Sequence, residues 1–262
     1  MKILVCLKLT AQSSFSASLR DGGERLDGGR VGINPADRCA LELALRTKEQ
    51  TPGAMVTVVA MAPEAAAYYL REALAMGADS AVLVSDRRIA GSDTLVTSAV
   101  LAAAVRSLPA QDLILCGKKA IDSETGHVGP QLSVLLGLPL ATNVLSFEAA
   151  GGRVELLRAG ERGQRVYTGP LPCVLTVCNG NEMVREPGIL GLRRARNAEI
   201  TRLSLDDLGL KAEEVGLDGS PTRTVKTEKL RFRSVEGRRI EDAAQGAEAL
   251  AALLRGGEEA AP

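Results

Sequence analysis

The stretch that decides the fold reads Asp112-Leu-Ile-Leu-Cys116, then Gly117-Lys-Lys-Ala-Ile-Asp-Ser-Glu-Thr-Gly-His-Val-Gly129, then Pro130-Gln-Leu-Ser-Val-Leu-Leu136. An apolar run of strand length is followed by a glycine-rich turn and then by a helical pattern. Glycines let the backbone approach a phosphate closely, and the first turn of a helix offers unpaired amide donors. Open α/β sheets bind their ligands at such junctions. The stretch therefore predicts an α/β fold that binds a nucleotide.

The same alternation of strands and helices extends over the first 145 residues. Apolar runs at 3–7, 56–61, 81–85 and 113–116 are predicted strands, and residues 37–48, 64–76 and 94–106 carry helical patterns. This order is typical of a mostly parallel, doubly wound, Rossmann-like sheet. Paired glycines at 22–23 and 28–29 predict a hairpin inserted within residues 11–32.

The second half of the chain has a different pattern. Short runs at 144–148, 154–158, 164–168 and 173–178 are separated by Gly-Gly or Gly-Pro turns and predict antiparallel strands, the last of which is apolar enough to rejoin the main sheet. Residues 180–227 show little regularity, and 241–255 predict a terminal helix that stops at two glycines. We expect a nucleotide-binding domain over 1–180 and an arm over 181–262 that needs a partner surface.

Composition excludes several classes of function. Lys and Arg (32) balance Asp and Glu (32), so nothing favours nucleic acid or an anionic membrane as partner. Five cysteines lack Cys-x-x-Cys spacing and a single histidine cannot complete a metal site, so we expect reduced cysteines and no metal. No apolar stretch reaches the length of a membrane span and no leader is evident, which predicts a cytoplasmic protein.

The glycine-rich turn is the first candidate ligand site. Gly117, Gly126 and Gly129 would permit close approach of a phosphate, and Asp122 and Thr125 would supply hydrogen bonds. The alternative is an ordinary turn in which Asp122 or Thr125 caps the following helix.

Two other helix starts are predicted to face the same crevice. Asp93, Thr94 and Thr97 open the helix that precedes this strand, and Asn34-Pro-Ala-Asp37 opens the first helix of the chain. Simple helix capping is the alternative at both places.

Two further features are less specific. His127 is predicted to be a loop residue beside the ligand rather than a proton-transfer group, because no nucleophile or carboxylate stands at a recognisable spacing. Any redox activity would therefore need a bound cofactor. Ile189 and Leu190 precede the basic cluster Arg193–Arg196 and could anchor another protein, unless the cluster is merely a solvated surface.

These residues together resemble the beta subunit of electron transfer flavoprotein, a family that includes the FixA-type proteins. The resemblance is carried by Val5-Cys-Leu-Lys8, Asn34-Pro-Ala-Asp37, Leu70-Arg-Glu-Ala-Leu-Ala-Met-Gly-Ala-Asp79 and Gly117-Lys-Lys-Ala-Ile-Asp122. It implies a heterodimer with an alpha subunit that holds the electron-transferring FAD. Residues 185–196 resemble the loop by which the family docks on acyl-CoA dehydrogenases, with Ile189 at the position of an anchoring leucine.

The resemblance also implies a second nucleotide in the beta subunit. It is AMP in one branch of the family and a second FAD in the electron-bifurcating branch, which oxidises NADH and can deliver electrons to ferredoxin. Three stretches resemble the bifurcating branch: Asp93-Thr94 with Thr97, Asp122-x-x-Thr125-x-x-Val128-Gly129-Pro130, and Gly219-Ser-Pro-Thr222. We therefore expect FAD, with AMP as the alternative.

The implied cofactor site can be divided into three parts. We expect the backbone from Gly126 to Gln131 to hold the phosphates, Asp122 and Thr125 to tie the loop, and Asp93, Thr94 and Thr97 to reach the flavin. The full expected set is Leu7, Asn34, Met61, Asp93, Thr94, Thr97, Gly117, Asp122, Thr125, Gly126, His127, Val128, Gly129, Pro130 and Gln131.

The glycine-rich stretch also departs from the family's usual sequence at two positions. Lys119 and His127 stand where the family commonly has glutamines. A stress-protein-type adenine-nucleotide-binding module is the alternative of another class, but it would have no need of the arm that follows residue 180.

Overall fold

The computed structural model describes residues 1–11, 18–20, 23–25, 31–178, 183–223, 225–226 and 239–255. The chain divides into two compact units, Met1–Val225 and Lys226–Pro262. The described part of the second unit contains α7, Ala243–Leu254, which confirms the predicted terminal helix. The glycines predicted to stop it lie outside the described residues. None of the helices in the described ranges is long and apolar enough to cross a membrane.

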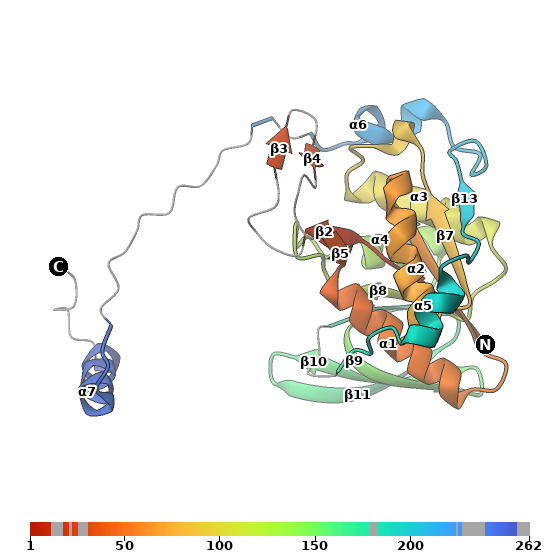
Figure 1. Ribbon diagram of the computed structural model, residues 1–262. Helices are drawn as coiled ribbons and strands as arrows, with labels where there is room; N and C mark the ends of the chain where they lie inside the picture. The colour runs from red at the N-terminus through yellow and green to blue at the C-terminus, as the bar shows by residue number, and fades with distance from the viewer. Residues whose placement is uncertain are drawn as a thin grey trace. The chain divides into compact units, whose positions relative to one another are not determined.

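The first unit is built on one large sheet with the strand order β11-β10-β9-β12-β8-β1-β6-β7-β13 (Figure 1). The strands are β1 Lys2–Cys6, β6 Met55–Met61, β7 Ser80–Val84, β8 Leu113–Gly117, β9 Leu140–Ala150, β10 Arg153–Gly160, β11 Gly163–Pro170, β12 Cys173–Val177 and β13 Thr201–Leu203. In this order, each neighbouring pair from β9 and β12 through to β7 and β13 is parallel, whereas the pairs β9–β10 and β10–β11 are antiparallel. The sequence-based prediction of a mostly parallel α/β sheet is thereby confirmed.

Helices cover both faces of the parallel strands. They are α1 Pro35–Gln50, α2 Ala67–Met76, α3 Thr94–Ser107 and α4 Val128–Leu136, and a short 3-10 helix, Glu64–Ala66, precedes α2. Ile3 and Val5 of β1 pack in the core with α1 and α2, while Leu4 and Cys6 pack in the core with α3 and α4. Because both faces are buried, the strands are continuous apolar runs rather than alternating ones.

Residues 140–177 differ in part from the prediction. β9, β10 and β11 form the expected antiparallel hairpins, but β12 inserts between β8 and β9 and is parallel to both. Val174 and Leu175 of β12 are fully buried, so this strand rejoins the main sheet. The inserted hairpin is present as β3, Ser18–Arg20, and β4, Gly23–Arg25, enclosed by the pair β2, Leu9–Ala11, and β5, Val31–Ile33.

The expectation of little regularity over residues 180–227 is wrong for several segments. The helices α5, Ile189–Ala195, and α6, Gly216–Gly219, a 3-10 turn at Ala212–Glu214 and the edge strand β13 all lie there. β13 pairs with β7, and α5 packs on α2. Such elements are too short for a periodic pattern, so only their tertiary contacts reveal them.

A strap at residues 183–187 leads into α5 and is held along α1 by charged side chains. Arg185 Nε donates to Glu42 Oε2 at 2.8 Å, and its backbone N–H donates to the same atom. Arg38 pairs with Glu186. Burial opposes the charge of Glu42, but the bonds from Arg185 and Arg46 keep the pKa of Glu42 below its usual range. The strap therefore fixes where α5 begins.

The packing of α5 on α2 requires a glycine at position 191. A Cβ atom at Gly191 would overlap the carbonyl of Ala75, whereas a Cβ atom at Gly188 would meet nothing within 4 Å. We expect Gly191→Ala to lower the free energy of unfolding by about 1–3 kcal/mol through displacement of α5. Gly188→Ala should cost less than about 1 kcal/mol. Denaturant unfolding of both variants measures this, and equal losses would contradict the packing argument.

Candidate functional site

The carboxyl ends of β1 and β8 define the crevice where a ligand is expected. From β1 the chain continues to β6 and β7 on one side, and it then returns to β8 on the other side of β1. The helices after β1 and β8 therefore leave on opposite faces. Ligands of open α/β sheets bind at such a switch point.

Asn34 holds the loop after β8 through two hydrogen bonds at this crevice. Its Oδ1 accepts from the backbone N–H of Ile121 at 3.1 Å, and its Nδ2 donates to the carbonyl of Lys119 at 3.0 Å. Asn34 precedes α1 but makes no side-chain cap, so the capping alternative is wrong here. The side chain is 1% exposed, and its polar atoms are satisfied by a segment 85 to 87 residues away.

Asp37 joins the ends of the two central strands. Its Oδ2 accepts from the backbone N–H of Lys8 at 2.7 Å, and its Oδ1 accepts from the backbone N–H of Gly117 at 2.9 Å. Burial raises the pKa of Asp37 from its ordinary 3.8 to about 6, although these hydrogen bonds oppose the rise. Because the folded protein then binds this proton more tightly than the unfolded chain does, the stability that Asp37 contributes falls as pH rises through about 6.

Sequence reasoning included Asp37 only as the end of the Asn34–Asp37 helix start and did not single out Asp37 or Lys8 as site residues. The available signal was an acidic side chain in the first turn of a helix that starts at the carboxyl edge of the sheet. Such a carboxylate is normally taken as favouring the helix dipole. Its real partners, the amides of Lys8 and Gly117, belong to distant segments and leave no local pattern.

Three charged side chains of the glycine-rich loop, those of Lys119, Asp122 and Glu124, are paired within the protein. Lys8 Nζ lies 2.7 Å from Asp122 Oδ1, and the side chain of Asp122 is only 9% exposed. Lys119 Nζ lies 2.8 Å from Glu124 Oε1. Asp122 thus ties the loop to β1, which is one of the two roles expected for it.

Two of the three loop glycines face the protein itself. A Cβ atom at Gly117 would overlap Asp37 Oδ1, and one at Gly129 would overlap the side-chain methyl of Thr176 in β12. Gly126 has φ +65°, a backbone conformation that favours glycine. Internal packing is therefore a sufficient reason for glycine at positions 117 and 129.

The first turn of α4 has no side-chain cap. His127 precedes the helix with its ring exposed, and neither Asp122 nor Thr125 caps it, so that alternative is wrong. The first amides of a helix have no intrahelical acceptor. Val128 and Gly129 supply such amides, and Pro130 has none to satisfy.

The start of α3 holds a segment from the far end of the first unit. Asp93 caps α3 by accepting from the backbone N–H of Val96, and its Oδ2 also accepts from Thr222 Oγ1 at 2.7 Å. Burial opposes ionisation of Asp93, yet these bonds lower its pKa. Ser220 Oγ accepts from the backbone N–H of Asp93 at 2.9 Å. Asp93 thus caps α3, as the capping alternative predicts, and it also holds residues 220–222 against the start of this helix.

A hydrogen bond between side chains joins the starts of α3 and α4. Ser98 Oγ lies 3.0 Å from Oε1 of Gln131 and 2.7 Å from the carbonyl of Thr94. Met61 ends β6 beside Val84, and Leu7 follows β1 with its N–H bonded to Val59. The expected residues therefore gather at the carboxyl edge of the sheet. Thr97 lies in the first turn of α3, and its side chain makes no hydrogen bond to any of the described residues.

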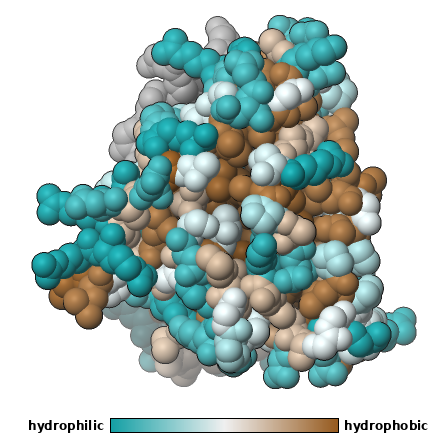
Figure 2. All heavy atoms as spheres, turned by 90° about the vertical axis from the view of Figure 1, so that its right-hand side faces the viewer, coloured by the Kyte–Doolittle hydropathy of each residue, from teal (hydrophilic) through white to brown (hydrophobic). Residues whose placement is uncertain are grey.

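The expected docking residues are exposed. Ile189 is 84% and Leu190 is 82% exposed, both in the first turn of α5. In Figure 1, α5 and β13 lie toward the right, and Figure 2 shows that on this side of the molecule hydrophobic surface lies between hydrophilic side chains.

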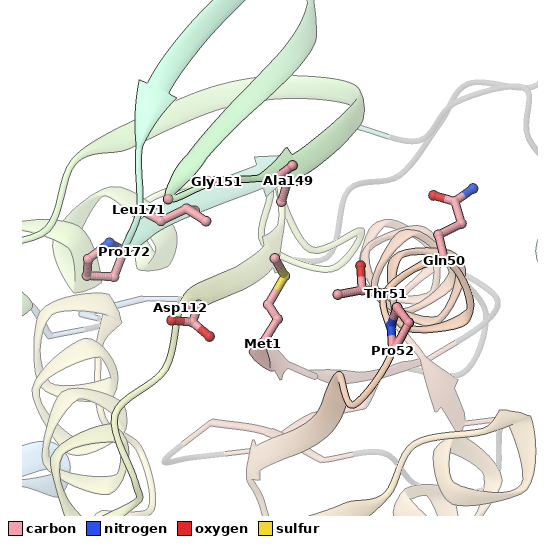
Figure 3. A pocket seen from close by; sticks show the side chains of 11 residues that line it. Met1, Gln50, Thr51, Pro52, Asp112, Ala149, Gly151, Leu171 and Pro172 are labelled. Carbon is pink, nitrogen blue, oxygen red and sulfur yellow. The ribbon is translucent and has the colours of Figure 1, made fainter.

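A separate cavity of about 610 Å³ lies at the opposite edge of the sheet (Figure 3). Its lining includes Met1, Thr51, Asp112, Gly151 and Pro172, from segments that precede strands or join β9 to β10. None of the expected cofactor residues lines it. Among the described residues, no group of three His, Cys, Asp or Glu side chains could hold a metal ion.

Comparison with known proteins gives the family. The electron transfer flavoprotein domain matches residues 27–208. The chain is 37% identical over 236 residues to electron transfer flavoprotein subunit beta of Megasphaera elsdenii, covering 86% of this chain and 86% of that protein. It is 42% identical over 196 residues to the subunit beta of Thermoanaerobacterium thermosaccharolyticum, covering 74% and 75%. It is 37% identical over 228 residues to caffeyl-CoA reductase-Etf complex subunit CarD of Acetobacterium woodii, covering 87% of each. With this crevice and these matches, the chain belongs to the family of electron transfer flavoprotein beta subunits.

Proposed function

We propose that this chain pairs with an alpha subunit and holds FAD in the crevice at the ends of β1 and β8. The observation that carries the proposal is the uncapped first turn of α4 beside the positive-φ Gly126. Backbone amides at a helix start suit a pyrophosphate. The nearby acids Asp122 and Glu124 are already paired with Lys8 and Lys119, which reduces their repulsion of a phosphate.

In this proposal the chain binds and orients the cofactor. FAD supplies the hydride and electron chemistry when bound. Val128 and Gly129 donate backbone amides to the phosphates, with Gln131 held in place by Ser98. Leu7, Asn34 and Met61 line the adenosine or ribitol end, and Asp93, Thr94 and Thr97 face the flavin. Thr125, His127 and Pro130 complete the loop around the phosphates.

FAD is favoured over AMP because the three stretches that resemble the bifurcating branch are linked in space. Thr222 donates to Asp93, and Gln131 contacts Ser98 one turn after Thr94. The hydrogen bonds between residues 220–222 and α3 would place a second protein surface against the flavin. AMP has no flavin and would not need this surface. We therefore propose electron bifurcation, with NADH as donor and ferredoxin as one acceptor.

The names of relatives suggest the class of redox partner. One relative is a caffeyl-CoA reductase-Etf complex subunit, and another is the acryloyl-CoA reductase electron transfer subunit gamma of Anaerotignum propionicum, which is 34% identical over 236 residues. We propose that an acyl-CoA dehydrogenase or a similar reductase in the cytoplasm docks at Ile189 and Leu190.

The arm over residues 181–262 is proposed to contact the alpha subunit. Its terminal helix α7 exposes Leu250, Leu253 and Leu254, at 58%, 58% and 80%. Leucines at this spacing form an apolar face that is favourable only when covered.

Nucleotide content tests the choice of cofactor. The heterodimer purified with its alpha subunit should release a second FAD in addition to that of the alpha subunit, and NADH should bleach the flavin spectrum. Chromatography of the denatured supernatant measures both nucleotides. A single FAD accompanied by AMP would support the non-bifurcating alternative instead.

Variants of α5 test the docking surface. The double variant Ile189→Ala with Leu190→Ala should raise the dehydrogenase concentration needed for half-maximal electron transfer by roughly tenfold or more, because exposed anchors supply much of an interface's energy. Val166→Ala, which truncates another exposed aliphatic side chain on β11, is the matched control. Unchanged kinetics in the double variant, at equal flavin content, would place docking elsewhere.

A further inference from the structure

The carboxylate of Asp37 occupies the switch point of the sheet. One oxygen accepts from the amide that follows β1, and the other accepts from the amide at the end of β8. Free amides at the ends of adjacent parallel strands would otherwise attract an anionic ligand. Asp37 therefore acts as an internal anion at the centre of the crevice.

The residues around Asp37 leave little room for a ligand group at the switch point. Asp37 is 6% exposed, and the absence of a side chain at Gly117 is what lets its Oδ1 approach the backbone. The positive charge of Lys8 lowers the pKa of Asp37, and its ammonium is itself paired with Asp122. The buried thiol of Cys116 also interacts with Asp37, and Cys6, burial and the charge of Asp37 raise the pKa of this thiol.

The start of α1 also holds the loop that follows β8. Asp37 holds the backbone of Lys8, whose ammonium reaches Asp122, and Asn34 holds the backbone of Lys119 and Ile121. Loss of the carboxylate would free β1 and β8 to shift relative to α1. The loop from 118 to 122 would lose its reference position, and α4 begins a few residues later.

We propose that Asp37 is the positioning residue of the nucleotide crevice: its carboxylate holds the ends of β1 and β8 together and, by occupying their amides, directs the phosphates to the first turn of α4. This inference rests on the proposed function for its ligand but not for its geometry. In this role Asp37 determines where a nucleotide binds, although Asp37 itself does not contact the nucleotide.

Chemical rescue tests the proposal in the complete heterodimer. Asp37→Ala should weaken binding of added FAD and AMP by roughly tenfold or more, since two amides lose a charged acceptor. Excess sodium formate should restore most of the affinity, because formate fits the vacated space and accepts from both amides. Sodium chloride of equal ionic strength and neutral formamide should not.

Asp112→Ala is the matched control. Asp112 Oδ2 accepts from the backbone N–H of Lys2 at 2.7 Å, which is the same kind of bond at the opposite edge of the same sheet. This variant should bind both nucleotides as the wild type does. Wild-type affinity in Asp37→Ala, or a loss that formate fails to restore, would overturn the proposal.

A measurement on the wild type covers the case in which Asp37→Ala does not fold. Hydrogen-exchange protection of the Lys8 and Gly117 amides, corrected for intrinsic rates, should fall relative to Lys2 as pH drops through about 6. Constant relative protection would overturn the inference. If the wild type binds neither FAD nor AMP while this protection behaves as expected, the proposed function fails and the geometric role of Asp37 remains.

Discussion

A buried carboxylate that accepts from two strand ends is the constraint on which the crevice depends. A charge with 6% exposure must be hydrogen-bonded, and the amides of Lys8 and Gly117 are the groups that satisfy Asp37. This arrangement costs stability at neutral pH, since burial raises the pKa of Asp37 to about 6. Through its two hydrogen bonds, Asp37 on α1 holds the ends of β1 and β8 in a fixed relation.

Electrostatic pairing extends outward from this centre. Asp122 is balanced by Lys8 and Glu124 by Lys119, so the loop before α4 presents backbone amides rather than unbalanced acids. Amides fixed by the fold need no reorganisation when an anion binds. The crevice of this electron transfer flavoprotein subunit therefore combines loop carboxylates that are already paired with a first turn of α4 that has no side-chain cap.

The far end of the first unit is tied to the same crevice by close backbone approaches. A Cβ atom at Gly91 would overlap Leu217, and one at Gly216 would overlap the carbonyl of Arg88. Together with the bonds from Asp93 to Thr222 and Ser220, these approaches hold α6 and residues 220–222 against the start of α3. The rim of the crevice thus includes residues about 90 positions beyond the end of the glycine-rich loop.

The sequence alone determined the parallel core, because strands buried on both faces must be continuous apolar runs and the helices between them carry their own period. It also located the glycine-rich loop between β8 and α4 and indicated the family. Only the tertiary structure decided that Gly117 faces Asp37, that Gly129 faces Thr176 and that Asn34 holds Lys119 and Ile121. Each of these contacts joins segments about 47 to 87 positions apart. Side chains that meet only after β1, β8 and α1 have packed leave no spacing in the chain from which their partners can be inferred.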